Sequence, residues 1–137
     1  MQITKYILPV VVGIILGAIL INQGENLVIK FYPLPPGINQ HDKEAIAIAL
    51  KQMPLSAFLF LLVNYALCSL IAGVISTLIA KRTTLIPAIV VGIFLTAGGL
   101  FNVISIKHPM WFSILNLFIY LPFTYLGYMA VRVKEPV

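Results

Sequence analysis

Charged residues are scarce in this chain. Only 9% of its 137 residues are Asp, Glu, Lys or Arg, whereas an ordinary soluble domain carries about 25%. Hydrophobic residues make up 61% of the sequence. So few charges cannot cover the surface of a soluble protein of this size. The composition therefore excludes an ordinary soluble domain and predicts that hydrocarbon surrounds most of the chain.

Cysteine and catalytic motifs are also nearly absent. Cys68 is the single cysteine, which excludes an intramolecular disulfide. No serine has a nearby histidine and acid in a nucleophile arrangement, and no Gly-rich phosphate loop or dinucleotide fingerprint is present. The basic residues lie near the ends of apolar runs and not on one face, which argues against nucleic acid as a partner. We therefore expect a protein with no catalytic residues and no cofactor, more in keeping with a non-enzyme than an enzyme.

What the chain has instead is long apolar runs. A helix needs about 20 apolar residues to cross a bilayer, and four runs approach or exceed that length, at 6–21, 55–80, 85–106 and 110–131. A signal peptide is the competing interpretation of the first run, but no small-x-small cleavage site follows Ile21. The sequence predicts an all-α, four-helix membrane bundle forming one domain over residues 1–137. The polar residues 22–26 are expected to end the first helix.

The polar connection 22–54 contains the Pro-rich segment 33–36, which favours an extended backbone. Asp42 could cap a short amphipathic helix that runs to about Gln52 and lies on the membrane surface. We single out these residues on the expected outer side: Tyr32, Pro35, Pro36, His41, Asp42, Glu44, His108 and Trp111.

Small residues recur at four-residue spacing in three of the expected helices, which allows close helix approach. They are Gly13 and Gly17 in the first, Ser69, Gly73 and Thr77 in the second, and Ala88, Gly92 and Thr96 in the third. The short link at 81–84 predicts that the second and third helices are antiparallel neighbours. We expect the stripes of these two helices to face each other.

None of the four predicted spans contains Asp, Glu, Lys, Arg or His. Proton-coupled pumps and charge-driven transporters usually need such a group within the membrane. Small four-helix multidrug exporters are similar in size, but they depend on a glutamate in the first helix, which 6–21 lacks. This absence makes a transporter or channel the weakest of the functional hypotheses.

Amide side chains occur where ionisable groups do not. Asn64, Asn102 and Asn116 all fall in the outer half of the expected bilayer. They could simply form hydrogen bonds between helices. Alternatively, they could form a pocket for a lipid headgroup, a quinone or another amphiphile, with these residues lining it: Tyr65, Tyr120 and Thr124.

Two histidines, His41 and His108, accompany several carboxylates on the expected outer side. Their spacing matches no metal-binding motif, so no metal site is predicted. His108 precedes Pro109 at the start of the last helix, where Trp111 is expected to be an interfacial anchor.

Two segments resemble those of small four-helix bacterial membrane proteins of no assigned activity. They are Tyr32-Pro33-Leu34-Pro35-Pro36-Gly37 and His108-Pro109-Met110-Trp111-Phe112. The resemblance implies the four-helix topology in a bacterial cytoplasmic membrane and transfers no site.

Basic residues lie densest beside the chain ends and the 81–84 link, which predicts that both termini are cytoplasmic. The leading functional hypothesis is a non-enzymatic accessory subunit that docks against other membrane proteins, or a second copy, through its small-residue stripes. Binding or processing of a lipid, quinone or other amphiphile in the asparagine layer is the alternative.

Overall fold

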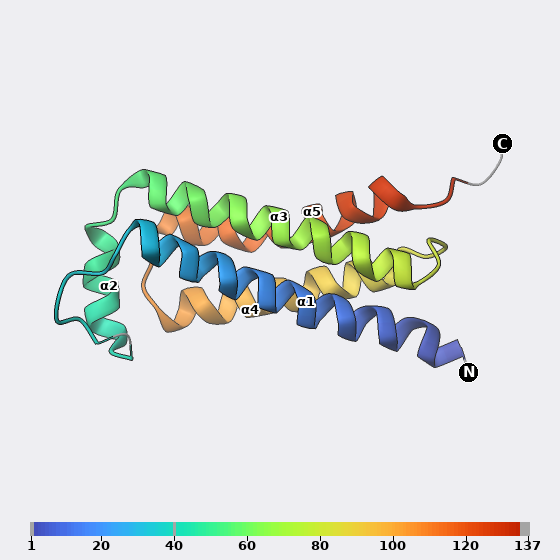
Figure 1. Cartoon of the computed structure of the whole chain (residues 1–137), viewed down its shortest axis with the longest axis horizontal. Helices are drawn as coiled ribbons and strands as arrows, with labels where there is room; N and C mark the ends of the chain where they lie inside the picture. The colour runs from blue at the N-terminus through green and yellow to red at the C-terminus, as the bar shows by residue number, and fades with distance from the viewer. Residues whose placement is uncertain (1, 40, 135–137) are drawn as a thin grey trace.

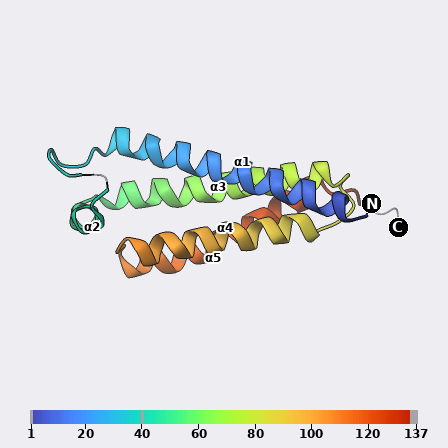
Figure 2. The same ribbon diagram turned by 90° about the horizontal axis from the view of Figure 1, so that it is seen from below.

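The computed structural model describes residues 2–39 and 41–134. Within them the chain forms five helices and no strand, and these are α1 (Gln2–Phe31), α2 (Lys43–Lys51), α3 (Leu55–Ile79), α4 (Ile86–Ser105) and α5 (Met110–Val131). All except α2 are long and apolar enough to cross a membrane. The prediction of an all-α protein with four such helices is confirmed. The long helices run alongside one another, and α2 lies across one end of them (Figures 1 and 2).

The first helix is much longer than the sequence predicted. The prediction was 6–21, but α1 extends over 30 residues to Phe31, or about 45 Å at 1.5 Å per residue. The polar residues 22–26 continue the helix although Asn and Gly are poor helix formers, because this turn packs against α3, where Glu25 bonds to Tyr65 and Gly24 leaves room for Asn64. Pro33 is the effective stop, because a proline disfavours helical backbone in the residue before it. The bounds of α3, α4 and α5 agree with the prediction to within one residue at each end.

The small residues lie inside the bundle. A Cβ added to Gly73 of α3 would lie 2.8 Å from the Cα of Thr124 in α5. A Cβ added to Gly92 of α4 would overlap the same threonine and lie 2.7 Å from a methyl of Leu121. Gly73 and Gly92, the central residues of the two stripes, therefore both face α5 and not each other. The backbone of α5 occupies the space that these glycines leave open.

The first helix uses its glycines in the same way. A Cβ on Gly13 would lie 2.7 Å from Val91 of α4 and 3.1 Å from Ser76 of α3. One on Gly17 would lie 3.3 Å from Ala72 of α3. The G-x-x-x-G spacing thus seats α1 on the groove between α3 and α4, within one chain.

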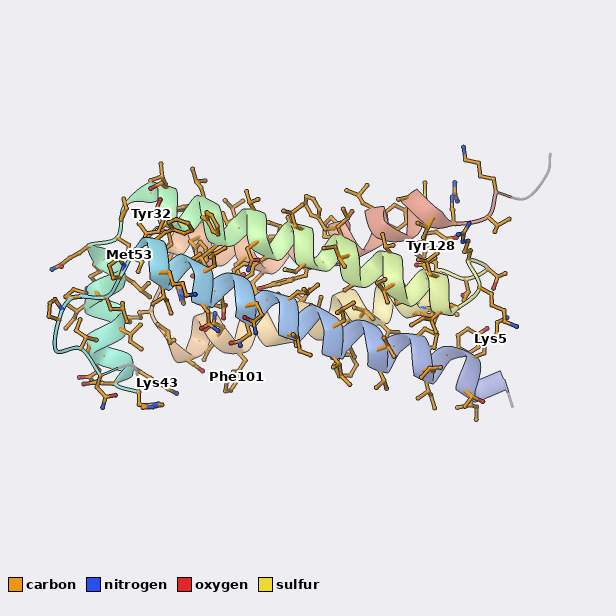
Figure 3. The ribbon with its side chains drawn as sticks, viewed as in Figure 1. Lys5, Tyr32, Lys43, Met53, Phe101 and Tyr128 are labelled. Atoms are coloured by element: carbon orange, nitrogen blue, oxygen red, sulfur yellow. The ribbon has the colours of Figure 1, made fainter. Side chains whose placement is uncertain are left out.

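The connection between α1 and α3 closes one end of the bundle. Asp42 caps α2 by accepting hydrogen bonds from the backbone N–H groups of Glu44 (3.1 Å) and Ala45 (3.3 Å). The helix buries Ala49 and Leu50, and the Tyr32 hydroxyl donates to Ser56 Oγ at 2.9 Å. In Figure 3, Tyr32, Lys43 and Met53 lie at this end, whereas Lys5 and Tyr128 lie at the other. The first residues of α1 and the last of α5 also share that other end (Figure 1).

Candidate ligand cavity

The longer α1 brings an acidic side chain into the bundle. Glu25 lies six residues before the end of α1, about 9 Å from that end. Its Oε1 accepts a hydrogen bond of 2.8 Å from the hydroxyl of Tyr65 on α3. The expectation that no long helix contains an ionisable group is therefore wrong. Glu25 is the residue around which the polar groups of the interior are arranged.

Two cavities meet at this carboxylate. The first has a volume of about 310 Å³ and lies between α1 and α4, with Tyr120 of α5 in its wall. The second, of about 250 Å³, lies beneath the connection and α2. Glu25 and Asn102 line both cavities. They thus form a polar layer between two chambers whose other lining is mostly apolar.

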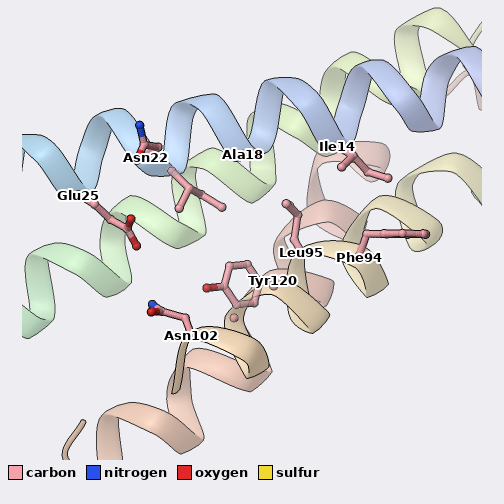
Figure 4. Close-up of a pocket in the computed structure, with 11 residues that line it drawn as sticks. Ile14, Ala18, Asn22, Glu25, Phe94, Leu95, Asn102 and Tyr120 are labelled. Atoms are coloured by element: carbon pink, nitrogen blue, oxygen red, sulfur yellow. The ribbon is translucent and has the colours of Figure 1, made fainter. Parts of the chain in front are cut away.

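The first chamber opens between two long helices. Figure 4 shows Glu25 and Asn22 on α1, and Asn102 on α4 with Tyr120 beside it, at one end of the cavity, with Ile14, Leu95 and Phe94 further along the helices. The side-chain amide of Asn102 forms no hydrogen bond with any residue that the structure describes, and it is partly exposed. An amide without a partner beside a carboxylate is available to a ligand.

The other two predicted asparagines have partners within the protein. Asn64 donates from Nδ2 to the carbonyl of Ile21 (3.3 Å) and accepts from Cys68 Sγ (3.3 Å). Gly24 of α1 leaves room for this asparagine, since an added Cβ there would overlap its side chain. Asn64 therefore joins α1 to α3, as the interhelical hydrogen-bond interpretation expects.

Asn116 is 0% exposed. It donates to the carbonyl of Gly99 (3.3 Å) and accepts from the Tyr120 hydroxyl (2.7 Å). It therefore holds α5 to α4 and orients Tyr120 in the cavity wall. Of the three asparagines, the structure places only Asn102 on a cavity.

Of the other predicted ligand-binding residues, the two tyrosines line the cavities and the threonine does not. The rings of Tyr65 and Tyr120 lie side by side with centroids 5.7 Å apart. Tyr65 holds Glu25, and each of the two tyrosines lines one of the cavities. Thr124 is buried against Gly73 and Gly92 and lines neither cavity.

The two outer histidines lie in different environments. His41 is exposed, and its backbone N–H bonds to the side chain of Asn39 (3.0 Å). His108 lines the second cavity, its ring stacks on Phe112 at 5.1 Å, and its Nδ1 lies 2.7 Å from the Ile106 carbonyl. Burial lowers the pKa of His108, and the bond to that carbonyl partly opposes the shift. Trp111 packs edge-on against Phe58 at 5.8 Å.

Among the described residues, no three His, Cys, Asp or Glu side chains gather as metal ligands would. Asp42 acts as a helix cap, and Glu44, Pro35 and Pro36 are exposed.

Glu25 was missed because the polar run around it was assigned to a loop. A signal was present in the sequence. Ile14, Ala18, Ile21, Glu25 and Val28 continue one face at helical spacing, and no proline interrupts it before Pro33. Following that period past Asn22 would have placed the carboxylate on the inner face of the helix.

Comparison of the chain with protein-family models, with curated proteins and with solved structures gives no match. Function is therefore inferred from these residues alone.

Proposed function

We propose that this is an integral membrane protein that binds an amphiphile, with the polar group of the ligand at Glu25 and Asn102. The observation that carries the proposal is the pair of chambers that share these two residues and are otherwise mostly apolar. Ligand sites are typically concave and apolar with a few polar groups that fix orientation. An ionisable residue at membrane depth is a candidate functional site by default.

Placement in a membrane is supported by the outer surface of the long helices. Large apolar side chains project outward along them, such as Phe101 at 73% exposure and Phe118 at 72%. In Figure 3, Phe101 points away from the bundle. A soluble monomer rarely exposes so much contiguous apolar surface. We propose that both termini are cytoplasmic, because Lys5, Lys81 and Arg82 lie at the end of the bundle where α1 begins and α5 ends (Figures 1 and 3).

A ligand would enter from the lipid. The first chamber lies between α1 and α4, and α2 with the connection covers the second. An amphiphile could therefore slide in laterally between α1 and α4 and keep its apolar part in hydrocarbon. Each chamber has the size of a fragment-like molecule or part of a lipid chain.

The accessory-subunit hypothesis was based mainly on small-residue stripes that would be free to contact a partner. The stripes that were expected to dock against partners contact other helices of the same chain. Transport is the second candidate, because Glu25 supplies the group whose absence argued against it, and the two chambers meet at that group.

A variant that fills the cavity tests the proposal. Gly98 lines the first chamber and has nothing within 4 Å of an added Cβ, so Gly98→Leu should fill the chamber without disturbing the packing. Ala97→Leu is the matched control, since Ala97 is exposed and lines neither chamber. The purified proteins are incubated with a membrane lipid extract that contains quinones and are then examined by native mass spectrometry.

We expect a bound amphiphile on the wild-type chain and the Ala97→Leu variant, and its loss from Gly98→Leu. A wild-type chain that retains nothing, or equal retention by both variants, contradicts binding in this cavity. Solute flux in liposomes that Gly98→Leu abolishes would identify the bound molecule as a transported one.

A further inference from the structure

Glu25 has no positively charged partner among the residues that the structure describes. Its hydrogen-bond partner among the described residues is the neutral hydroxyl of Tyr65. Among the described residues, no Lys, Arg or His nitrogen lies within salt-bridge distance, and Tyr65 is the sole side chain that bonds to it. A charge at membrane depth without a partner is costly, so a ligand that brings the opposite charge would gain more here than a neutral one.

Neither chamber offers a positive charge to a ligand. The described lining of both chambers contains no Lys and no Arg. His108 lines the second, but burial lowers its pKa, so its imidazole is neutral at neutral pH. A phosphate or carboxylate headgroup would therefore meet the Glu25 carboxylate with no positive charge in the lining to offset the repulsion.

The neighbouring polar groups are suited to a donor. A carboxylate accepts hydrogen bonds only, and the side-chain amides of Asn22 and Asn102, which line the first chamber, each add a carbonyl acceptor beside their N–H donors. An ammonium group carries up to three N–H donors. The ring of Tyr120 in the cavity wall can also attract a cation through its π face.

From this charge and donor balance we infer that the ligand is a hydrophobic amine, bound in its protonated form, with the ammonium at Glu25 and its apolar part in the adjoining chamber. This inference rests on the proposed function, because it names the chemical class of the molecule that the cavity holds. It requires no covalent step.

Three probes with the same chain separate the classes. Dodecylamine, dodecan-1-ol and dodecyl phosphate carry the same alkyl chain on a cationic, a neutral and an anionic headgroup, so their apolar contribution to binding is shared. Binding of each to the purified wild-type chain is measured by native mass spectrometry over a concentration series. The same series is run with Glu25→Gln, which keeps the shape of the side chain and removes its charge.

We expect the amine to bind wild type about tenfold more tightly than the alcohol, because the ammonium adds the attraction of opposite charges to the hydrogen bond that both headgroups can donate to Glu25. The phosphate should bind most weakly. Glu25→Gln should abolish the preference for the amine, because the amine loses the opposite charge whereas the alcohol keeps a neutral acceptor at the same position. Asn102→Asp, which adds a second carboxylate, should increase the preference for the amine.

The results distinguish the two proposals. Equal binding of amine and alcohol to wild type, with both lost in Gly98→Leu, overturns the amine inference and leaves amphiphile binding intact. An amine preference that persists in Glu25→Gln places the cation elsewhere and also overturns it. If none of the three probes binds wild type, the amine inference fails, and amphiphile binding is decided by the lipid-extract experiment above. The wild-type comparison needs no variant, so it decides even if the E25Q chain does not fold.

Discussion

Two glycines in neighbouring helices should respond to alanine in opposite directions. Gly98 of α4 faces open space, with nothing within 4 Å of an added Cβ. Gly73 of α3 faces backbone, and an added Cβ would lie 2.8 Å from the Cα of Thr124 and 2.9 Å from its carbonyl carbon. Both positions are helical, so an alanine gains the same helix propensity at each.

The magnitude follows from these distances. Replacing a helical glycine by alanine is favourable by about 0.5–1 kcal/mol where the methyl has room, so Gly98→Ala should stabilise the fold by that amount. At Gly73 the methyl meets backbone, which cannot rotate away, and α3 and α5 must move apart. Overpacking of this kind costs about 1–3 kcal/mol. The two variants should therefore differ by about 1–3 kcal/mol in free energy of unfolding, with Gly73→Ala the less stable.

The assay is unfolding in mixed micelles, with increasing sodium dodecyl sulfate and the loss of helix followed by far-ultraviolet circular dichroism. Wild type and both variants are compared in the same host detergent. If Gly73→Ala were as stable as Gly98→Ala, α3 and α5 would not be in close backbone contact. The small-residue stripe would then be free for a partner, as the accessory-subunit hypothesis requires.

Three further changes test the site and its surroundings. Tyr65→Phe removes the donor to Glu25 and should lower the free energy of unfolding by about 1–3 kcal/mol in the same assay; unchanged stability would mean that the 2.8 Å bond does not form. His108 has a pKa below its ordinary 6.5 in the folded chain, so the unfolded chain binds more protons and stability should fall as the pH drops from about 7.5 to about 5, by at most about 1.4 kcal/mol per pH unit. His108→Gln should weaken this pH dependence and His41→Gln, at an exposed position, should keep it; equal slopes in both variants would contradict the assignment. Asp42→Ala removes the cap of α2, which costs about 1 kcal/mol, and should speed amide hydrogen exchange in residues 43–51 without affecting α3; unchanged exchange in α2 would show that the cap is dispensable.

The apolar runs 55–80, 85–106 and 110–131 were predicted to within one residue, because their hydrophobicity and length leave no other structure for the backbone. The four-residue spacing likewise predicted which faces of the helices carry the small residues. It did not predict which helix packs against each face, because spacing within one helix contains no information about its neighbour. Only the packed bundle shows that α5 contacts both stripes.

The candidate site shows the same division. The three asparagines and two tyrosines were identified by residue type, since polar groups in apolar helices need partners. Which of these side chains find a hydrogen-bond partner within the protein depends on the distances between the packed helices. Asn64 and Asn116 found backbone carbonyls, whereas Asn102 was left on a cavity. Glu25 was misplaced because residues 22–26 resemble a loop when taken apart from the helix that precedes them.

The amino-acid order by itself determined that this chain forms long apolar helices with its polar residues concentrated in a few places, because hydrophobicity and helical period are local properties. The tertiary structure decided that α1 continues to Phe31 and turns Glu25 inward, towards Tyr65 and two chambers. That outcome depends on contacts between residues 40 positions apart, which no local pattern encodes.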